Sequence, residues 1–313
     1  MFNAVDIIVV GRFSGSQALA AVGSTSALIN VFTNLFIGIS LGANVLTARF
    51  YAAGREKEVS ETVHTAITLA LVSGIVMALV GLVFSKGALA LMGTPDDVIG
   101  LSALYMRIYF LGMPFFMLYN YGAAILRAVG DTKRPLLFLM IAGVINACLN
   151  MVLVIVFKLG VAGVAIATVI SQMISCVLVL RCLCRSESSY RLRFSELGMK
   201  GYYLKQIFSV GVPAGIQSTV INFSNVLLQS SVNSFGSTAM AGYTAANNLL
   251  GFLYVSVNSI TQACMSFTSQ NYGVGKLKRM DRVLADCMIL SVVVAVVLGC
   301  ICYGFGPEIL QLS

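Results

Sequence analysis

Long apolar runs alternate with short charged clusters along the whole chain. A helix needs roughly 20 apolar residues to cross a bilayer, and eight runs reach that length. We therefore predict membrane-spanning helices over 18–50, 60–92, 101–127, 135–157, 161–183, 207–232, 239–269 and 283–306. The apolar residues before position 12 are too few to span, and no basic region or cleavage site marks them as a signal peptide. They indicate the end of a further helix whose beginning is missing.

Positive charges follow the same alternation. Of the 20 Lys and Arg residues, 16 lie in every second connection, near 49–58, 127–134, 181–205 and 276–282, and three lie in the other connections. Cytoplasmic loops are enriched in these residues. The pattern predicts a multi-pass protein of the cell (inner or plasma) membrane, with its N-terminus and the 186–205 linker in the cytoplasm. Topology and anionic lipid headgroups explain the net charge of +8 without a nucleic-acid partner.

Composition agrees with a lipid environment. Apolar residues make up 58% of the 313 residues and charged residues 10%, with a mean hydropathy of +0.91. Soluble domains carry roughly 25% charged residues, because water must hydrate their surfaces.

The sequence contains no Walker motif, no HExxH and no nucleophile elbow. We predict an all-α polytopic membrane protein that is not an enzyme.

An internal repeat appears when the chain is compared with itself at an offset of 221 residues. Over 12–92 against 233–313, 16 of 81 positions are identical, including Tyr51 with Tyr272 and Gly54 with Gly275. Because six spans separate the copies, the repeat unit is six helices, and parallel repeats of this kind are typical of transporters. We predict an N-lobe (1–185), a cytoplasmic linker (186–205) and a partial C-lobe (206–313). About nine of twelve helices are then present, the first one incomplete.

Ionisable and polar residues inside predicted spans are candidates for function, since burying them in lipid is costly. Asp6 is the one acid well within a span, and it either binds a proton or Na+ or pairs with Arg12 near the interface. Asn146 and Asn150 are four residues apart and share a helix face. From spacing alone, these two and Thr168 are explained better by interhelical hydrogen bonds than by cation binding. His64, the only histidine, is expected at the surface.

Other in-span residues predict helix kinks and a polar cavity. Pro114 and Pro213 lie inside spans and should kink their helices, because proline removes a backbone hydrogen bond. Polar residues also recur in the second half of the chain. The candidates for a substrate cavity there are Gln217, Asn222, Asn225 and Asn247.

The ordered set of motifs resembles the multidrug and toxic compound extrusion (MATE) family, and its DinF-like branch best. The motifs run along the whole chain: Val5-Asp6-x-x-x-x-Gly11, Ala53-Gly54-Arg55, Gly112-x-Pro114-Phe115, Leu126-Arg127-Ala128-x-Gly130-Asp131-Thr132-Lys133-x-Pro135, Asn146-x-x-x-Asn150, Gly163-x-Ala165-x-Ala167-Thr168, Gly211-x-Pro213 and Gln270-Asn271-x-Gly-x-Gly275.

The resemblance implies two six-helix lobes and secondary active efflux by alternating access. It implies a monomer that exchanges small organic, often cationic, substrates for H+ or Na+, with no cofactor. The cation site carried over from the family is Asp6, Asn146, Asn150 and Thr168, and any bound Na+ would lie at Asp6. Some members carry Asp where this chain has Asn150, which leaves the choice of ion open.

Three alternatives remain at this point. A lipid-linked oligosaccharide flippase of the same superfamily shares the repeat, but such proteins tend to line their cavity with several cations. Here Arg107 is the only Lys or Arg that lies within a span and is not counted in a connection. A non-transporting membrane receptor or scaffold would need no coupling acid. The chain as it stands is also compatible with an inactive fragment.

Overall fold

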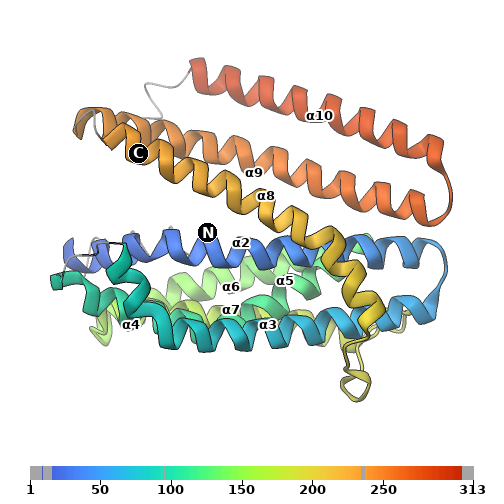
Figure 1. Cartoon of the computed structure of the whole chain (residues 1–313), viewed down its shortest axis with the longest axis horizontal. Helices are drawn as coiled ribbons and strands as arrows, with labels where there is room; N and C mark the ends of the chain where they lie inside the picture. Colours follow the sequence, from blue (N-terminus) through green and yellow to red (C-terminus); the bar gives the residue numbers. More distant parts are fainter. Residues whose placement is uncertain (1–8, 10–15, 93, 95, 234–236, 305–313) are drawn as a thin grey trace. The chain divides into compact units, whose positions relative to one another are not determined.

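The computed structural model describes residue 9 and residues 16–92, 94, 96–233 and 237–304. These residues are helical apart from short connections (Figure 1). The α-helices are α2 (Ser16–Ala52), α3 (Glu56–Leu91), α4 (Asp96–Leu111), α5 (Met113–Ala128), α6 (Lys133–Met151), α7 (Gly160–Cys184), α8 (Gly201–Asn233), α9 (Ser237–Gly273) and α10 (Leu277–Gly304). Two short elements accompany them, η1 (Val152–Val156) and η2 (Phe194–Glu196). The prediction of an all-α polytopic fold is confirmed, and Asp6 lies outside the described residues.

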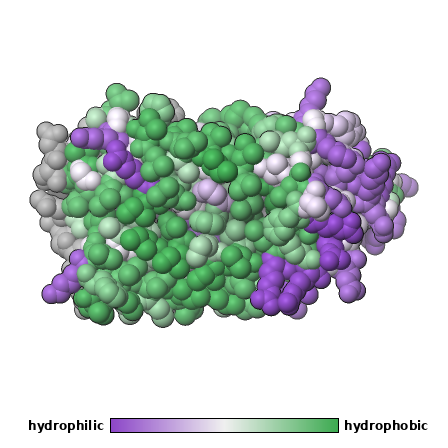
Figure 2. Space-filling view, turned by 90° about the horizontal axis from the view of Figure 1, so that it is seen from below, coloured by the Kyte–Doolittle hydropathy of each residue, from purple (hydrophilic) through white to green (hydrophobic). Residues whose placement is uncertain are grey.

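Over the residues that the structure describes, the predicted spans coincide with helices. Five helices are long and apolar enough to cross a membrane, or up to six if the bent pair α4–α5 counts as one span. Helices α8 and α9 are as long as the others, but polar residues such as Gln217 and Asn258 lower their mean hydropathy. Figure 2 shows hydrophobic side chains over most of the face it draws, with hydrophilic ones gathered mainly toward one end.

The described residues form two compact units. Unit 1 comprises the residues up to Thr47 together with Glu56–Ser218, and unit 2 comprises Ala48–Arg55 together with the residues from Thr219 onward. Helices α2 and α8 each contribute to both units. The predicted lobes and linker remain a prediction about the whole chain.

Unit 1 is held together by close helix packing. Lipid is as apolar as a protein core, so tight van der Waals contact and hydrogen bonds replace the hydrophobic effect between membrane helices. A Cβ added to Gly74 of α3 would lie 2.5 Å from the Cα of Pro114 in α5. Glycine thus brings the two backbones together, and large side chains such as Phe110 and Tyr121 fill the remaining space, fully buried.

Helices α4 and α5 form a bent pair. They meet at Gly112 with an angle of 47° between them. Pro114 occupies the first turn of α5, where its missing N–H costs nothing because that group has no partner inside the helix. Pro213, in contrast, lies inside α8, which continues through it.

The first half of α8 packs on α2 through glycines. A Cβ on Gly38 would lie 2.2 Å from the Cα of Gly215, and one on Gly42 would lie 2.2 Å from the carbonyl oxygen of Ile207. Both contacts lie within unit 1, so the start of α8 is fixed to this unit at its backbone.

The connection between α7 and α8 begins with a hairpin. The backbone N–H of Leu192 donates to the carbonyl of Leu183 at 3.2 Å, which closes the hairpin at its base. Leu192 is buried, whereas Glu187 and Ser188 at the tip are exposed. The chain then runs through η2 to the start of α8.

Unit 2 is built on the antiparallel pair α9 and α10 (Figure 1). They are joined by a turn in which Gly275 has a φ of +71°, a conformation that glycine adopts without strain. A Cβ on Gly273 would lie 2.1 Å from the carbonyl oxygen of Arg49, so α9 ends in backbone contact with the end of α2.

Candidate functional site

Three of the four residues predicted to bind a cation form one buried chain of hydrogen bonds. Asn150 Nδ2 donates to Asn146 Oδ1 at 3.2 Å, and Asn146 Nδ2 donates to Thr168 Oγ1 at 3.2 Å. The exposed fraction of all three residues is at most 1%. The contact joins α6 to α7 inside unit 1. The fourth residue, Asp6, lies outside the described residues.

Local backbone geometry explains how these side chains meet. Asn146 and Asn150 are one turn apart on α6, so both point toward α7. The following turn, η1, is a π-helix, an element that often marks functional sites in membrane and soluble helices. Gly160 then starts α7 with a φ of +53°, which brings Thr168 level with the two amides.

The cluster of Asn146, Asn150 and Thr168 offers uncharged oxygen atoms as possible cation ligands. Asn and Thr side chains offer carbonyl and hydroxyl oxygens, which are the ligands that hard cations prefer. Among the described residues, no three His, Cys, Asp or Glu side chains gather in a group that could hold a metal ion.

The buried polar surface extends one turn further along α7, which the sequence interpretation missed. Gln172 is 3% exposed, and its Oε1 has no hydrogen-bond partner among the described residues. That oxygen lies 2.8 Å from where a Cβ on Gly112 would be, so it faces the break between α4 and α5. The i, i+4 spacing from Thr168 was the available signal, because it places Gln172 on the same face of α7.

A second missed contact fixes α2 to α5. Asn44 Nδ2 donates to the carbonyl of Ala124 at 2.8 Å, and Asn44 is 4% exposed. Nearby in sequence, the hydroxyl of the fully buried Tyr121 has no hydrogen-bond partner in the described part of the chain. The interior of unit 1 is thus more polar than a core that serves packing alone.

The predicted substrate-cavity residues do not form such a buried group. Gln217 and Asn225 are exposed, and Asn222 is half-buried. Asn247 lies in α9, but its side chain is outside the described part of the structure. Their assignment to a substrate cavity stays a prediction.

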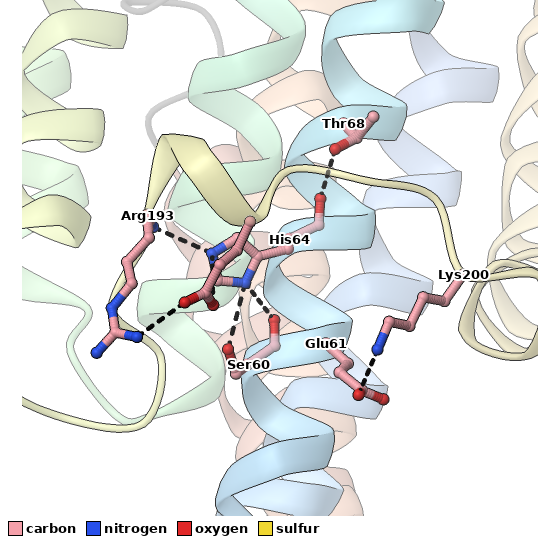
Figure 3. A network of polar contacts seen from close by, with 7 residues as sticks. Ser60, Glu61, His64, Thr68, Arg193 and Lys200 are labelled. Carbon is pink, nitrogen blue, oxygen red and sulfur yellow. Dashed lines mark hydrogen bonds and ion pairs between the residues drawn. The ribbon is translucent and has the colours of Figure 1, made fainter.

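His64 is at the centre of a different polar network (Figure 3). Its Nε2 accepts the backbone N–H of Arg193 at 3.0 Å, and its Nδ1 lies 2.7 Å from the carbonyl oxygen of Ser60. A carbonyl only accepts, so Nδ1 donates this bond while Nε2 accepts the other. His64 is 4% exposed, so the expectation of a surface residue is wrong: the connection before α8 folds back over it.

Two charged contacts flank His64 (Figure 3). Arg193 Nη1 donates to Glu196 Oε1 at 2.8 Å, and this bond lowers the pKa of Glu196 below its ordinary value of 4.5. Lys200 Nζ donates to Glu61 Oε1 of α3. We call residues 193–200 the docked segment, because the bonds from Arg193 to His64 and from Lys200 to Glu61 attach it to α3.

Comparisons with known proteins agree with the geometry. The family model MatE matches residues 1–152 and 213–313. The chain is 34% identical to "Probable multidrug resistance protein YoeA" of Bacillus subtilis (strain 168) over 98% of its own length and 68% of that protein. It is 22% identical to "Multidrug export protein MepA" of Staphylococcus aureus (strain NCTC 8325 / PS 47) over 96% of its length and 67% of that protein.

The fold has a close match among solved structures. The outward-facing conformation of a multidrug resistance MATE family transporter of the MOP superfamily aligns with a TM-score of 0.91 and 21% sequence identity. The alignment covers 99% of this chain and 69% of that one. The chain therefore spans about two thirds of the length of these relatives.

Proposed function

Because the chain belongs to the MatE family of membrane transporters, we propose that it exports small organic compounds from the cell by antiport against H+ or Na+. The observation that carries the proposal is the buried chain of hydrogen bonds from Asn150 through Asn146 to Thr168. Two of the relatives described above are named for multidrug resistance or export. A multi-pass protein of the cell membrane fits the exposed apolar side chains of the helices, and we propose that it acts as a monomer.

The proposed coupling site combines the neutral oxygens of this cluster with the carboxylate of Asp6. A carboxylate in a partly desolvated place binds a proton or a metal cation readily, because either one removes the cost of its charge. The amide and hydroxyl oxygens would complete the coordination of Na+ or accept hydrogen bonds from the protonated acid. Asp6 supplies the charge and the other three residues orient it.

The proposed mechanism is alternating access. Binding of the cation favours one conformation of the transporter, and the affinity for the organic substrate differs between conformations. The coupling is reciprocal. A bound substrate must therefore lower the protein's affinity for the cation by the same factor by which a bound cation lowers its affinity for the substrate. Exchange of one for the other then drives efflux. Small organic, often cationic, compounds are the proposed substrates.

The experiment uses the 313-residue chain in proteoliposomes loaded with ethidium. Either a pH gradient or a Na+ gradient is imposed alone, and ethidium efflux is followed by fluorescence. We expect efflux only with the gradient of the coupling ion. The variant Asp6→Asn should lose gradient-driven efflux, and Asn150→Ala should weaken it.

Asp281→Asn is the matched control, since Asp281 is an exposed acid at the start of α10, far along the chain from the proposed site. It should transport like the unmodified chain. Undiminished gradient-driven efflux by Asp6→Asn would overturn the coupling site. A properly inserted chain that moves no ethidium under either gradient would overturn export by this chain.

A further inference from the structure

The turn between α9 and α10 borders a hollow in unit 2 of about 440 Å³. Three cations line it: Lys276, Arg279 and Arg282. The lining also holds one acid, Asp286, and the amide side chain of Asn271. The lining is therefore net positive by two charges, and it can both donate and accept hydrogen bonds.

The three cations have no partner of opposite charge in the described part of unit 2. None of them makes an ion pair or a side-chain hydrogen bond to another described residue. Like charges brought together repel, and a bound anion would relieve this repulsion. The Arg side chains in particular present planar donor groups that match phosphate oxygens.

The wall of the hollow is fixed in place. The guanidinium of Arg49 lies 4.8 Å from the ring centroid of Tyr272, a cation–π contact between the end of α2 and the end of α9. The backbone contact of Gly273 with Arg49 joins the same two ends. Ala52, which lines the hollow, is thereby held against α9.

The internal repeat inverts the charge at two of the three cation positions, whereas Lys276 corresponds to another cation, Arg55. At the offset of 221, Arg279 corresponds to Glu58 and Arg282 to Glu61. In the first copy, Glu61 accepts a hydrogen bond from Lys200 of the docked segment. In the first copy, therefore, an acid on α3 binds a cation that belongs to another segment of the chain. The second copy carries arginine instead, so its occupant should be an anion.

Apolar residues beside the cations point to a lipid. Phe267 and Val274 line the hollow and are 54% and 44% exposed. Leu290 and Val293 lie one and two turns beyond Asp286 on the same side of α10 and continue this exposed apolar surface, at 50% and 51%. A phospholipid can place its phosphate among the cations while its acyl chains lie along α10. Free phosphate would leave this apolar surface uncovered.

We propose that the hollow at the α9–α10 turn binds the phosphate of an anionic phospholipid headgroup, held by Lys276, Arg279 and Arg282. Asp286 and Asn271 can accept hydrogen bonds from hydroxyl groups of a polyol headgroup such as that of phosphatidylglycerol. This end of α9 is also the side that the distribution of Lys and Arg assigns to the cytoplasm. The proposal does not depend on transport activity.

Native mass spectrometry of the full chain in detergent tests the proposal. Phosphatidylglycerol or phosphatidylcholine is titrated in, and the fraction of protein that carries lipid is measured. We expect saturable binding of phosphatidylglycerol. The double variant Arg279→Gln/Arg282→Gln should lower the affinity about tenfold or more, because it removes charge-assisted hydrogen bonds.

The matched control is Lys205→Gln/Lys278→Gln. It removes the same charge from exposed positions that do not line the hollow, one of them in the same turn. It should bind phosphatidylglycerol like the unmodified chain. If the control loses as much binding as the arginine variant, the lipid is attracted by the overall positive charge of the protein, and the proposal of a specific site is overturned. Equal retention of lipid by both variants would also overturn it.

Two further measurements complete the test. One distinguishes a phospholipid from free phosphate, and the other distinguishes the loss of the arginine donors from misfolding of the variant. Inorganic phosphate at millimolar concentration should not displace the lipid, and full displacement would assign the hollow to free phosphate instead. The variant Arg279→Lys/Arg282→Lys keeps both charges but loses the planar donors, so it should bind with intermediate affinity. If the glutamine variant does not fold, unchanged binding by this lysine variant and by Arg282→Gln alone would overturn the proposal.

Discussion

The imidazole of His64 accepts a hydrogen bond from the backbone of Arg193, 129 residues later in the chain, at 3.0 Å. This bond attaches the docked segment to the first turns of α3. The ring is buried and its other nitrogen is occupied by the carbonyl of Ser60, so the segment is held by a specific contact. Two of the predictions below concern this attachment.

Removing the imidazole should release the docked segment. His64→Ala deletes a buried acceptor, so the backbone N–H of Arg193 loses its hydrogen-bond partner. The attachment of the segment should weaken by about 1–3 kcal/mol. We expect trypsin to cleave at Arg193 and Lys200 about tenfold faster than in the unmodified chain, as followed by mass spectrometry. Thr68→Ala is the control: the hydroxyl of Thr68 bonds only to the carbonyl of His64 within α3, so cleavage should stay unchanged. Equal rates in both variants would contradict the role of the ring.

Acid should weaken the same attachment. The hydrogen bond from Arg193 lowers the pKa of Glu196 below 4.5, so the carboxylate stabilises the folded segment above pH 4.5. This stabilisation is lost as the pH falls through the lowered pKa. Hydrogen exchange of the 193–200 peptides, corrected for intrinsic rates, should rise as the pH falls below 4.5. Glu196→Gln should abolish this dependence, whereas Glu187→Gln at the exposed hairpin tip should retain it.

A methyl group at Gly74 should push α3 away from α5. The added Cβ would lie 2.5 Å from the Cα of Pro114, and a backbone atom cannot move aside as a flexible side chain can. We expect Gly74→Ala to destabilise unit 1 by about 1–3 kcal/mol, the usual cost of overpacking. Gly143→Ala in α6 is the control, because nothing lies within 4 Å of its added Cβ. Thermal unfolding in detergent should separate the two, and equal midpoints would refute the close packing.

The Asn146–Thr168 hydrogen bond should appear as an energetic coupling between α6 and α7. A double-mutant cycle with Asn146→Ala and Thr168→Val should give about 0.5–2 kcal/mol, as interhelical hydrogen bonds in membranes do. The measurement is the free energy of unfolding in mixed micelles. Ser171→Ala should be additive with Asn146→Ala, since the Ser171 hydroxyl bonds back to Ala167 inside α7. A coupling near zero for the first pair would show that the contact carries no energy.

Hydropathy was sufficient to predict the helices, because each run of about 20 apolar residues has few ways to satisfy its backbone in lipid other than as a helix. The bend between α4 and α5 also had a signal, since Gly112 and Pro114 both disfavour a continuous helix. The pairing of Asn146 with Asn150 followed from helical spacing. These features depend on residues close together in the sequence.

The contacts that sequence reasoning missed join distant residues. His64 follows a charged loop and looks like a surface residue, but the docked segment covers it from 129 positions away. Nothing local marks Gln172 as facing Gly112, because that relation depends on how α7 packs against α5. The three cations at the α9–α10 turn were interpreted as a topology signal, and only the hollow shows that they converge.

The hairpin that precedes the docked segment suggests where the protein could be engineered. Its base is closed by the bond from Leu192 to Leu183, and its tip at Glu187 and Ser188 is exposed. A small folded domain inserted at the tip would leave α7, the docked segment and α8 unchanged. Such an insertion would supply a marker for electron microscopy. The same insertion within residues 193–200 should disturb the fold, because it would detach the docked segment from α3.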